Sequence, residues 1–254
     1  MTDGRPVSHT RRPAPSHQAA ARDRVSLRLL GGFELRFAGR PIGAPLSVER
    51  LLAFVCLQNR PVNRSFVAGT LWPDTIDARA AANLRSALWR LRRLSRGLLE
   101  TTATHVRLGA DAAVDAHELS ASIWRVLDAS KEPATSDLLN VCAPCELLPG
   151  WYEEWVLVER ERLRQLRLHA LETLCERLTE TRRFGPAVEA GLTAVQEEPL
   201  RESAQRALIR AYLAEGNASD AIHQYRRYRA MLDEELGLEP SPQMLDLVRP
   251  LTTS

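Results

Sequence analysis

The sequence of 254 residues has few of the residues on which enzyme active sites and nucleotide sites depend. It contains one lysine, Lys131, and neither a Gly-x-x-x-x-Gly-Lys-Ser loop nor a Gly-x-Gly-x-x-Gly loop, which argues against the common phosphate-binding sites. Its six scattered histidines and the lack of a Gly-x-Ser-x-Gly elbow leave no hydrolase constellation. We therefore expect no catalytic residue, no cofactor and no enzymatic activity.

Long apolar runs are missing as well. No stretch approaches the roughly 18 apolar residues of a membrane span, so we expect no membrane partner. Residues 1–24 contain arginines and prolines but no apolar block, which predicts a disordered leader and not a secretory signal. Without secretion, the four cysteines are expected to be reduced thiols in a cytoplasmic, nucleoid-associated protein.

Cys142 and Cys145 form a Cys-x-x-Cys spacing, which is typical of redox sites and zinc sites. The pair lies between predicted helices and not in a βαβ unit, and no second pair of cysteines or histidines at ligand spacing accompanies it. We therefore expect no metal site and regard the two cysteines as incidental.

Charge is distributed unevenly, although the net charge is only +2. Residues 24–110 contain 14 basic and 5 acidic residues, whereas residues 111–254 contain 16 basic and 25 acidic residues. A basic front half is expected to meet a polyanion, while phosphate would repel the acidic back half. The split predicts two modules with different partners.

The front half is predicted to be a small sheet followed by a helix-turn-helix and a hairpin. Ser47 is the expected N-cap of the first helix, which ends near Asn59, and Pro61 and Pro73 separate the helices. A hairpin after the third helix is typical of the wing of a winged helix. The expected strands are 26–30, 33–37 and 42–46, the helices 47–59, 66–72 and 79–94, and the hairpin strands 98–102 and 105–108.

The predicted helix at residues 79–94 is the most informative stretch. Leu84, Leu88 and Leu91 recur at helical spacing, and the opposite face carries Trp89 among arginines. Such a face suits the phosphates and base edges of a DNA major groove, although arginine-rich faces are often only solvated. Trp89 is then either a reader of thymine methyl groups or a packing residue. The candidates for base contact are Ser86, Trp89, Arg90 and Arg93, and those for phosphate contact are Arg64, Arg79, Arg85, Arg92, Arg96 and Arg107.

The back half is predicted to be all helix, with helices at 116–129, 133–140 and 151–183. Beyond these, apolar positions recur at a period of 34 residues, as in Leu174 and Leu208, Leu178 and Tyr212, and Ala187 and Ala221. This period is typical of tetratricopeptide repeats, which stack helical hairpins and leave a groove for a partner.

Several motifs together resemble the Streptomyces antibiotic regulatory proteins (the SARP family). They are Leu71-Trp72-Pro73-Asp74, the segment Ala81–Arg93, Val114-Asp115-Ala116-His117, Leu148-Pro149-Gly150 and Glu235-Leu236-Gly237-Leu238-Glu239-Pro240-Ser241. The resemblance covers residues 25–251 and implies a mainly α fold with small β-sheets. It implies an N-terminal OmpR-type winged helix at residues 25–111 and an all-α, tetratricopeptide-like bacterial transcriptional activator domain at residues 112–254.

The same resemblance implies a sequence-specific activator of an antibiotic gene cluster. Such a protein is expected to bind direct repeats in double-stranded DNA near the −35 element, as side-by-side protomers or a homodimer, and to recruit RNA polymerase holoenzyme through σ. The larger family members carry ATPase and sensor domains, so this chain is expected to be a small member. Trp89 departs from the smaller or polar residue of many relatives. The alternative is a helical-repeat adaptor whose basic N-terminal domain binds an acidic protein or RNA.

Overall fold

The computed structural model describes residues 25–95 and 97–252, which fold into two compact units. Within the described residues, the first unit comprises residues 25–28 and Phe33–Ala113. The second unit comprises Leu29–Gly32 and the chain from Val114 onward. Residues 1–24, the predicted leader, lie outside the described residues.

The first unit begins with a sheet of order β3-β2-β1-β7, in which β1 and β2, and β2 and β3, pair antiparallel. Leu27 in β1 (Val25–Arg28) lies opposite Leu35 in β2 (Glu34–Phe37), and both are buried, as the alternation predicts. The third strand was predicted too late. Ala38 and Gly39 form the turn with positive φ angles of 51° and 76°, so β3 (Arg40–Ile42) already starts at Arg40. The last strand is β7 (Ala113–Val114).

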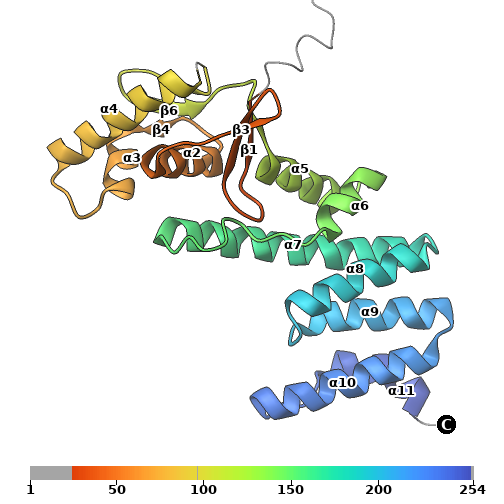
Figure 1. The fold of residues 1–254 in the computed structure, drawn as a ribbon. Helices are drawn as coiled ribbons and strands as arrows, with labels where there is room; N and C mark the ends of the chain where they lie inside the picture. The colour runs from red at the N-terminus through yellow and green to blue at the C-terminus, as the bar shows by residue number, and fades with distance from the viewer. Residues whose placement is uncertain (1–24, 96, 253–254) are drawn as a thin grey trace, which may run out of the picture. The chain divides into compact units, whose positions relative to one another are not determined.

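Three helices follow the sheet: α2 (Leu46–Gln58), α3 (Arg64–Leu71) and α4 (Asp77–Leu94). The prediction of Ser47 as N-cap is wrong, because the carbonyl of Pro45 already accepts from the backbone N–H groups of Val48 and Glu49. The predicted end of α2 is confirmed, with Asn59 as a left-handed C-cap. Figure 1 shows the three helices grouped beside one another.

The predicted hairpin after α4 is confirmed as β5 (Leu99–Thr101) paired with β6 (His105–Leu108). A further strand, β4 (Val62–Asn63), pairs with the other edge of β6 and was not predicted, because two residues show no periodicity. Val62 lies opposite Val106, and both side chains are buried. The wing is therefore anchored to the segment that connects α2 to α3.

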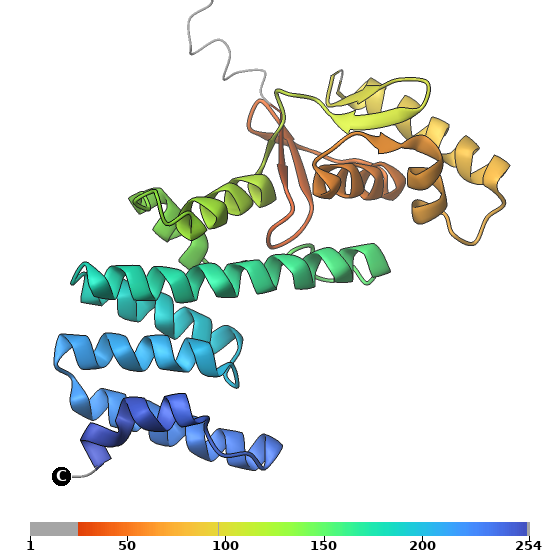
Figure 2. The same ribbon diagram turned by 180° about the vertical axis from the view of Figure 1, so that it is seen from behind.

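The second unit is helical, and Figure 2 shows its successive helices stacked side by side. The 34-residue period is confirmed as a repeat of helical hairpins: Leu174 and Leu208 are buried in the first helices of successive hairpins, and Ala187 and Ala221 in the second helices. The helices are α5 (Asp115–Leu127), α6 (Thr135–Cys142), α7 (Glu154–Glu180), α8 (Phe184–Glu197), α9 (Glu202–Glu215), α10 (Ala218–Leu236) and α11 (Pro242–Thr252).

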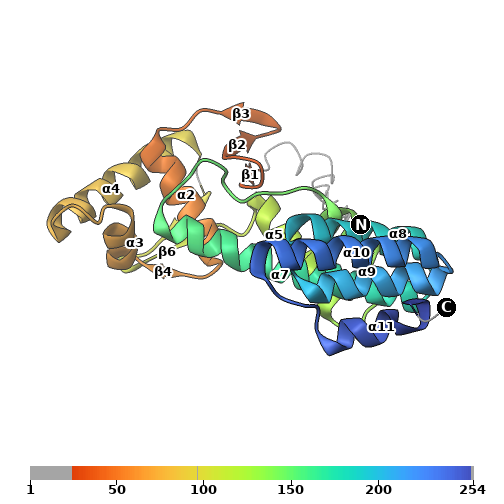
Figure 3. The same ribbon diagram turned by 90° about the horizontal axis from the view of Figure 1, so that it is seen from below.

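Helix α11 was not predicted, and it covers the end of the repeat. Its Met244 and Val248 are buried in one cluster with Ile209 of α9 and Tyr228 of α10. Figure 3 shows α11 lying along these two helices. A terminal helix of this kind shields the apolar face that the last hairpin would otherwise expose.

Three arginines of α7 fix the segments before it through backbone carbonyl groups. Arg160 donates to the carbonyls of Leu147, Leu148 and Trp151, and Arg167, which is only 2% exposed, donates to Val141 and Ala143 at the end of α6. Arg177 donates to Val126 and Asp128 at the end of α5. The bonds from Arg167 and Arg177 satisfy carbonyl groups that the ends of α6 and α5 leave without partners.

None of the helices in the described part of the chain combines the length and apolar character that crossing a membrane requires.

Candidate nucleic-acid interface

Helix α4 presents one apolar side to the core of the first unit and an arginine-rich side to the surroundings. Its buried residues are Ala80, Leu84, Ala87, Leu88 and Leu91. Successive residues turn by about 100° around a helix axis, so the line directly opposite this core contains Ala82, Ser86, Trp89 and Arg93. The exposed line thus holds three of the four residues predicted to contact bases.

Trp89 does not pack into the core. Its side chain is 59% exposed, and the guanidinium carbon of Arg93 lies 4.9 Å from the centre of its ring. This distance is in the range of a cation–π contact. Of the two roles left open by the sequence, packing within the core is excluded by this exposure, and the tryptophan and the arginine form one surface feature.

Ser86 uses its hydroxyl hydrogen within the helix. Its Oγ donates to the carbonyl oxygen of Ala82 at 3.0 Å. In this arrangement the hydroxyl oxygen keeps its lone pairs for a further donor. A ligand at this point of α4 would therefore offer an N–H group to Ser86.

The remaining arginines of α4 lie on two flanks of the exposed line. Arg85 and Arg92 lie on one flank, and Arg79 and Arg90 on the other. Arg92 donates to the Thr101 hydroxyl of β5 at 2.6 Å, so the first flank is the one that faces the wing. All four side chains are exposed.

Acidic residues are nearly missing from α4. Asp77 is the only one in its sequence, and it stands in the first turn, where negative charge suits the helix dipole. Across the described residues, Arg79, Arg85, Arg90 and Arg93 form no ion pair with a carboxylate. The exposed face of α4 therefore carries uncompensated positive charge.

Two other predicted phosphate contacts already have partners on the wing. Arg64 donates to the carbonyl of Thr102 at 3.2 Å, and its backbone N–H donates to Thr104. Arg107 pairs with Glu100, which lies directly opposite it in the β5–β6 register, at 2.5 Å. Exposed ion pairs of this kind contribute little energy, so a phosphate could compete for Arg107. Arg96 lies outside the described residues.

Sequence reasoning missed the wing residue Thr101 and the exposed Ile76. Thr101 accepts a hydrogen bond from Arg92, and only the packing of the wing beside α4 shows that the two side chains meet. Ile76 is the N-cap of α4 and is strongly exposed. It lies in a turn, where no periodicity marks a residue as exposed or buried.

The Cys-x-x-Cys pair shows no sign of activation. Burial raises the pKa of the Cys142 thiol and of the Cys145 thiol, and this effect outweighs the nearby Arg167 guanidinium, which favours the thiolate. A reactive cysteine has a lowered pKa. Within the described residues, no group of three or more His, Cys, Asp or Glu side chains is placed to hold a metal ion.

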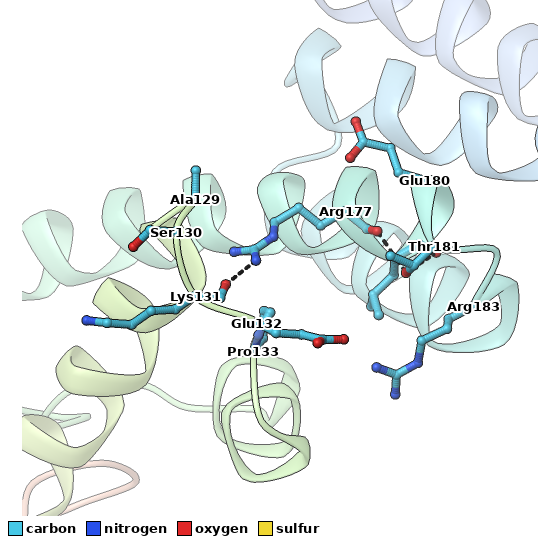
Figure 4. Close-up of a pocket in the computed structure, with 10 residues that line it drawn as sticks. Ala129, Ser130, Lys131, Glu132, Pro133, Arg177, Glu180, Thr181 and Arg183 are labelled. Atoms are coloured by element: carbon cyan, nitrogen blue, oxygen red, sulfur yellow. Dashed lines mark hydrogen bonds between the residues drawn. The ribbon is translucent and has the colours of Figure 1, made fainter.

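A polar pocket of about 430 Å³ lies in the second unit, between the segment after α5 and the end of α7 (Figure 4). Its cationic groups come from Lys131, Arg177 and Arg183. Arg177 is occupied by backbone carbonyls, including that of Lys131, and the Lys131 ammonium pairs with Asp128 at 2.9 Å. Two of the three cationic side chains that line the pocket are therefore already paired within the protein.

The elements of the first unit define a winged helix-turn-helix, and those of the second define a tetratricopeptide-like helical repeat. Residues 131–251 match the family model described as "Bacterial transcriptional activator domain". The chain thus contains a match to this domain and is homologous over most of its length to the regulatory proteins AfsR and EmbR.

The similarity extends over most of the chain. It is 26% identical to the regulatory protein AfsR of Streptomyces coelicolor over 97% of this chain and 26% of AfsR. It is 25% identical to the transcriptional regulatory protein EmbR of Mycobacterium tuberculosis over 89% of this chain and 63% of EmbR. The chain thus spans about a quarter of AfsR and less than two-thirds of EmbR.

A solved structure has the same fold. It is that of "Mycobacterium tuberculosis EmbR in complex with low affinity phosphopeptide", with a TM-score of 0.72 and 22% sequence identity. The match covers 90% of this chain and 65% of the EmbR chain.

Proposed function

We propose that this chain is a sequence-specific DNA-binding transcriptional activator. The observation that carries the proposal is the exposed face of α4, where four arginines without carboxylate partners in the described residues surround Trp89 and Ser86. In a winged helix this helix enters the major groove, and the hairpin beside it reaches the flanking backbone. Positive charge on both features would attract the phosphates.

The two flanks of α4 suggest how the contacts divide. Ser86, Trp89 and Arg93 would face the floor of the groove and contact base edges, with Arg90 reaching in from one side. Arg79 on that side, and Arg85 and Arg92 on the side of the wing, would contact phosphates on the two walls. Arg64 and Arg107 would hold the backbone near the wing, and Arg96 is proposed from its sequence position alone.

The division of labour would follow the charge split. Residues 25–111 are proposed to bind DNA, and the acidic residues 112–254 to contact protein partners. The SARP resemblance suggests direct repeats near a −35 element, a homodimer on DNA, RNA polymerase holoenzyme with σ as the partner, and an antibiotic gene cluster as the target. The similarity to AfsR and EmbR, both named as regulators, supports the coarser part of this proposal.

Mobility-shift titrations of the full chain against promoter fragments, with scrambled duplex as competitor, test the proposal. Arg93→Ala is expected to weaken specific binding by about 1–3 kcal/mol if Arg93 contacts a base. The control is Arg226→Ala with Arg227→Ala, which removes positive charge from the exposed face of α10. Unchanged binding by the Arg90→Ala, Arg93→Ala double variant would refute the assignment of α4. Equal binding to scrambled duplex would instead favour an adaptor for RNA or an acidic protein.

A further inference from the structure

Trp89 and Arg93 form a structured pair on the surface that the fold of the first unit does not require. The tryptophan lies directly opposite the buried side of α4 and is more exposed than buried. Arg93 follows it by four residues, the spacing at which helical side chains meet, and its guanidinium covers the ring at 4.9 Å. The exposed indole and the guanidinium stacked on it therefore present an apolar surface and hydrogen-bond donors together at one point of the arginine-rich face.

The stack restricts Arg93. A free arginine side chain samples many rotamers, and ordering it on binding costs free energy. Contact with the ring removes part of that freedom before a ligand arrives. The described residues offer Arg93 no carboxylate, so its N–H groups remain available to acceptors outside the chain.

The chemistry of the two side chains limits which bases they suit. A guanidinium and an indole N–H are donors only. Guanine presents two acceptors in the major groove, and thymine presents one acceptor and a methyl group, whereas adenine and cytosine present an amine donor. The pair therefore fits guanine and thymine and disfavours the amine of cytosine or adenine.

We infer that Trp89 and Arg93 recognise, as one unit, a guanine with a thymine at the adjacent base step. This inference rests on the proposed DNA-binding function. Arg93 binds O6 and N7 of the guanine, and the guanidinium takes the plane of that base. The Trp89 ring, which lies against the guanidinium, is then at the level of the next base pair, roughly 3.4 Å away along the strand. There it contacts the methyl group of the thymine. Ser86, one turn earlier, accepts an N–H from an adenine or cytosine amine.

The test uses the full chain and a pool of random duplexes, from which bound sequences are selected and counted. Selected sites are expected to contain a guanine next to a thymine. Trp89→Ala is expected to lose the thymine preference and keep the guanine preference, while Arg93→Ala loses the guanine preference. The matched control is Arg85→Ala on the flank, which is expected to weaken binding and keep both preferences.

The decisive measurement replaces that thymine with deoxyuridine, which removes only the methyl group. Burial of one methyl is worth about fourfold in affinity, so the wild type is expected to bind about fourfold more weakly. Trp89→Ala is expected to bind both duplexes equally, and its thermal midpoint should equal that of the wild type. The inference is overturned if loss of the methyl group weakens binding equally in the wild type and in Trp89→Ala, or if it weakens binding in neither. Either result leaves the proposed function intact. A wild type without sequence preference overturns both.

Discussion

Glu202 connects three parts of the second unit through one carboxylate. It accepts hydrogen bonds from the backbone N–H of Ser241 at 2.9 Å and from the Tyr228 hydroxyl at 3.2 Å, and it pairs with Arg206 at 2.6 Å. Burial raises the pKa of Glu202, but the hydrogen bonds from Ser241 and the Arg206 charge outweigh it and hold the pKa below its ordinary value of 4.5. The charged form therefore holds the start of α11 against α9.

Glu202→Gln is expected to destabilise the second unit by about 1.5–3 kcal/mol at pH 7, because a neutral amide replaces a charged acceptor. Because folding lowers the pKa of Glu202, its contribution to the free energy of unfolding is fully present above pH 4.5 and is lost as the pH falls through the folded-state pKa. Urea unfolding should therefore show the difference shrinking below pH 4.5. Glu235→Gln, on the exposed surface of α10, is the control and should unfold like the wild type. Identical stability of Glu202→Gln and wild type at pH 7 would contradict the role of the carboxylate.

At the scale of elements, α8 and α9 approach closely where α8 has a glycine. A Cβ atom at Gly191 would lie 3.0 Å from Leu208 Cδ1 and 3.1 Å from Cys175 Sγ. Both neighbours are fully buried, so neither has free space into which to move. The absence of a side chain at this position thus sets the spacing of the helical repeat.

Gly191→Val is expected to destabilise the second unit by about 1–3 kcal/mol, because overpacking a tight core forces the helices apart. Gly185→Ala is the matched control in the same helix, since a Cβ there meets nothing within 4 Å. It should be neutral or slightly stabilising, because alanine favours helix more than glycine does. Chemical unfolding followed by circular dichroism distinguishes the two. A stable Gly191→Val variant would show that the interface tolerates the added volume.

At the scale of the whole molecule, the basic first half and the acidic second half should differ in their affinity for a polyanion. The basic residues of the first unit include exposed arginines on both flanks of α4, whereas the arginines of the second unit are largely paired with its many acids. Salt dependence of binding counts the phosphates that are neutralised. The salt dependence therefore distinguishes arginines that contact phosphates from arginines elsewhere on the protein.

Removal of one phosphate contact is expected to lower the slope of log affinity against log salt by about 1. Arg85→Ala should show this loss on specific and scrambled duplexes alike. Arg226→Ala with Arg227→Ala should keep the wild-type slope, because both residues lie in the acidic half. Titrations at several salt concentrations measure these slopes. If the Arg226, Arg227 variant loses slope and Arg85→Ala does not, the acidic half is the one that contacts DNA.

Much of the fold could be predicted from local patterns. The period of Leu84, Leu88 and Leu91 predicted the buried side of α4, and the recurrence of Ala187 at Ala221 predicted the repeated hairpins. The misses have local causes. The strand formed by Val62 and Asn63 is too short to show an alternating pattern. Serine is a common N-cap residue, which favoured Ser47, but the helix begins earlier because the carbonyl of Pro45 accepts its first backbone hydrogen bonds.

The sequence by itself determined the basic face of α4, the opposite charges of the two halves and the repeat, because composition and periodicity can be read along the chain without knowing which elements pack together. Only the tertiary structure decided that Trp89 is uncovered, that Arg92 meets Thr101 and that Glu100 occupies Arg107. A helical wheel gives the direction of a side chain, but not whether another element covers it. That depends on how separate elements pack against one another, which the pattern within one element does not specify.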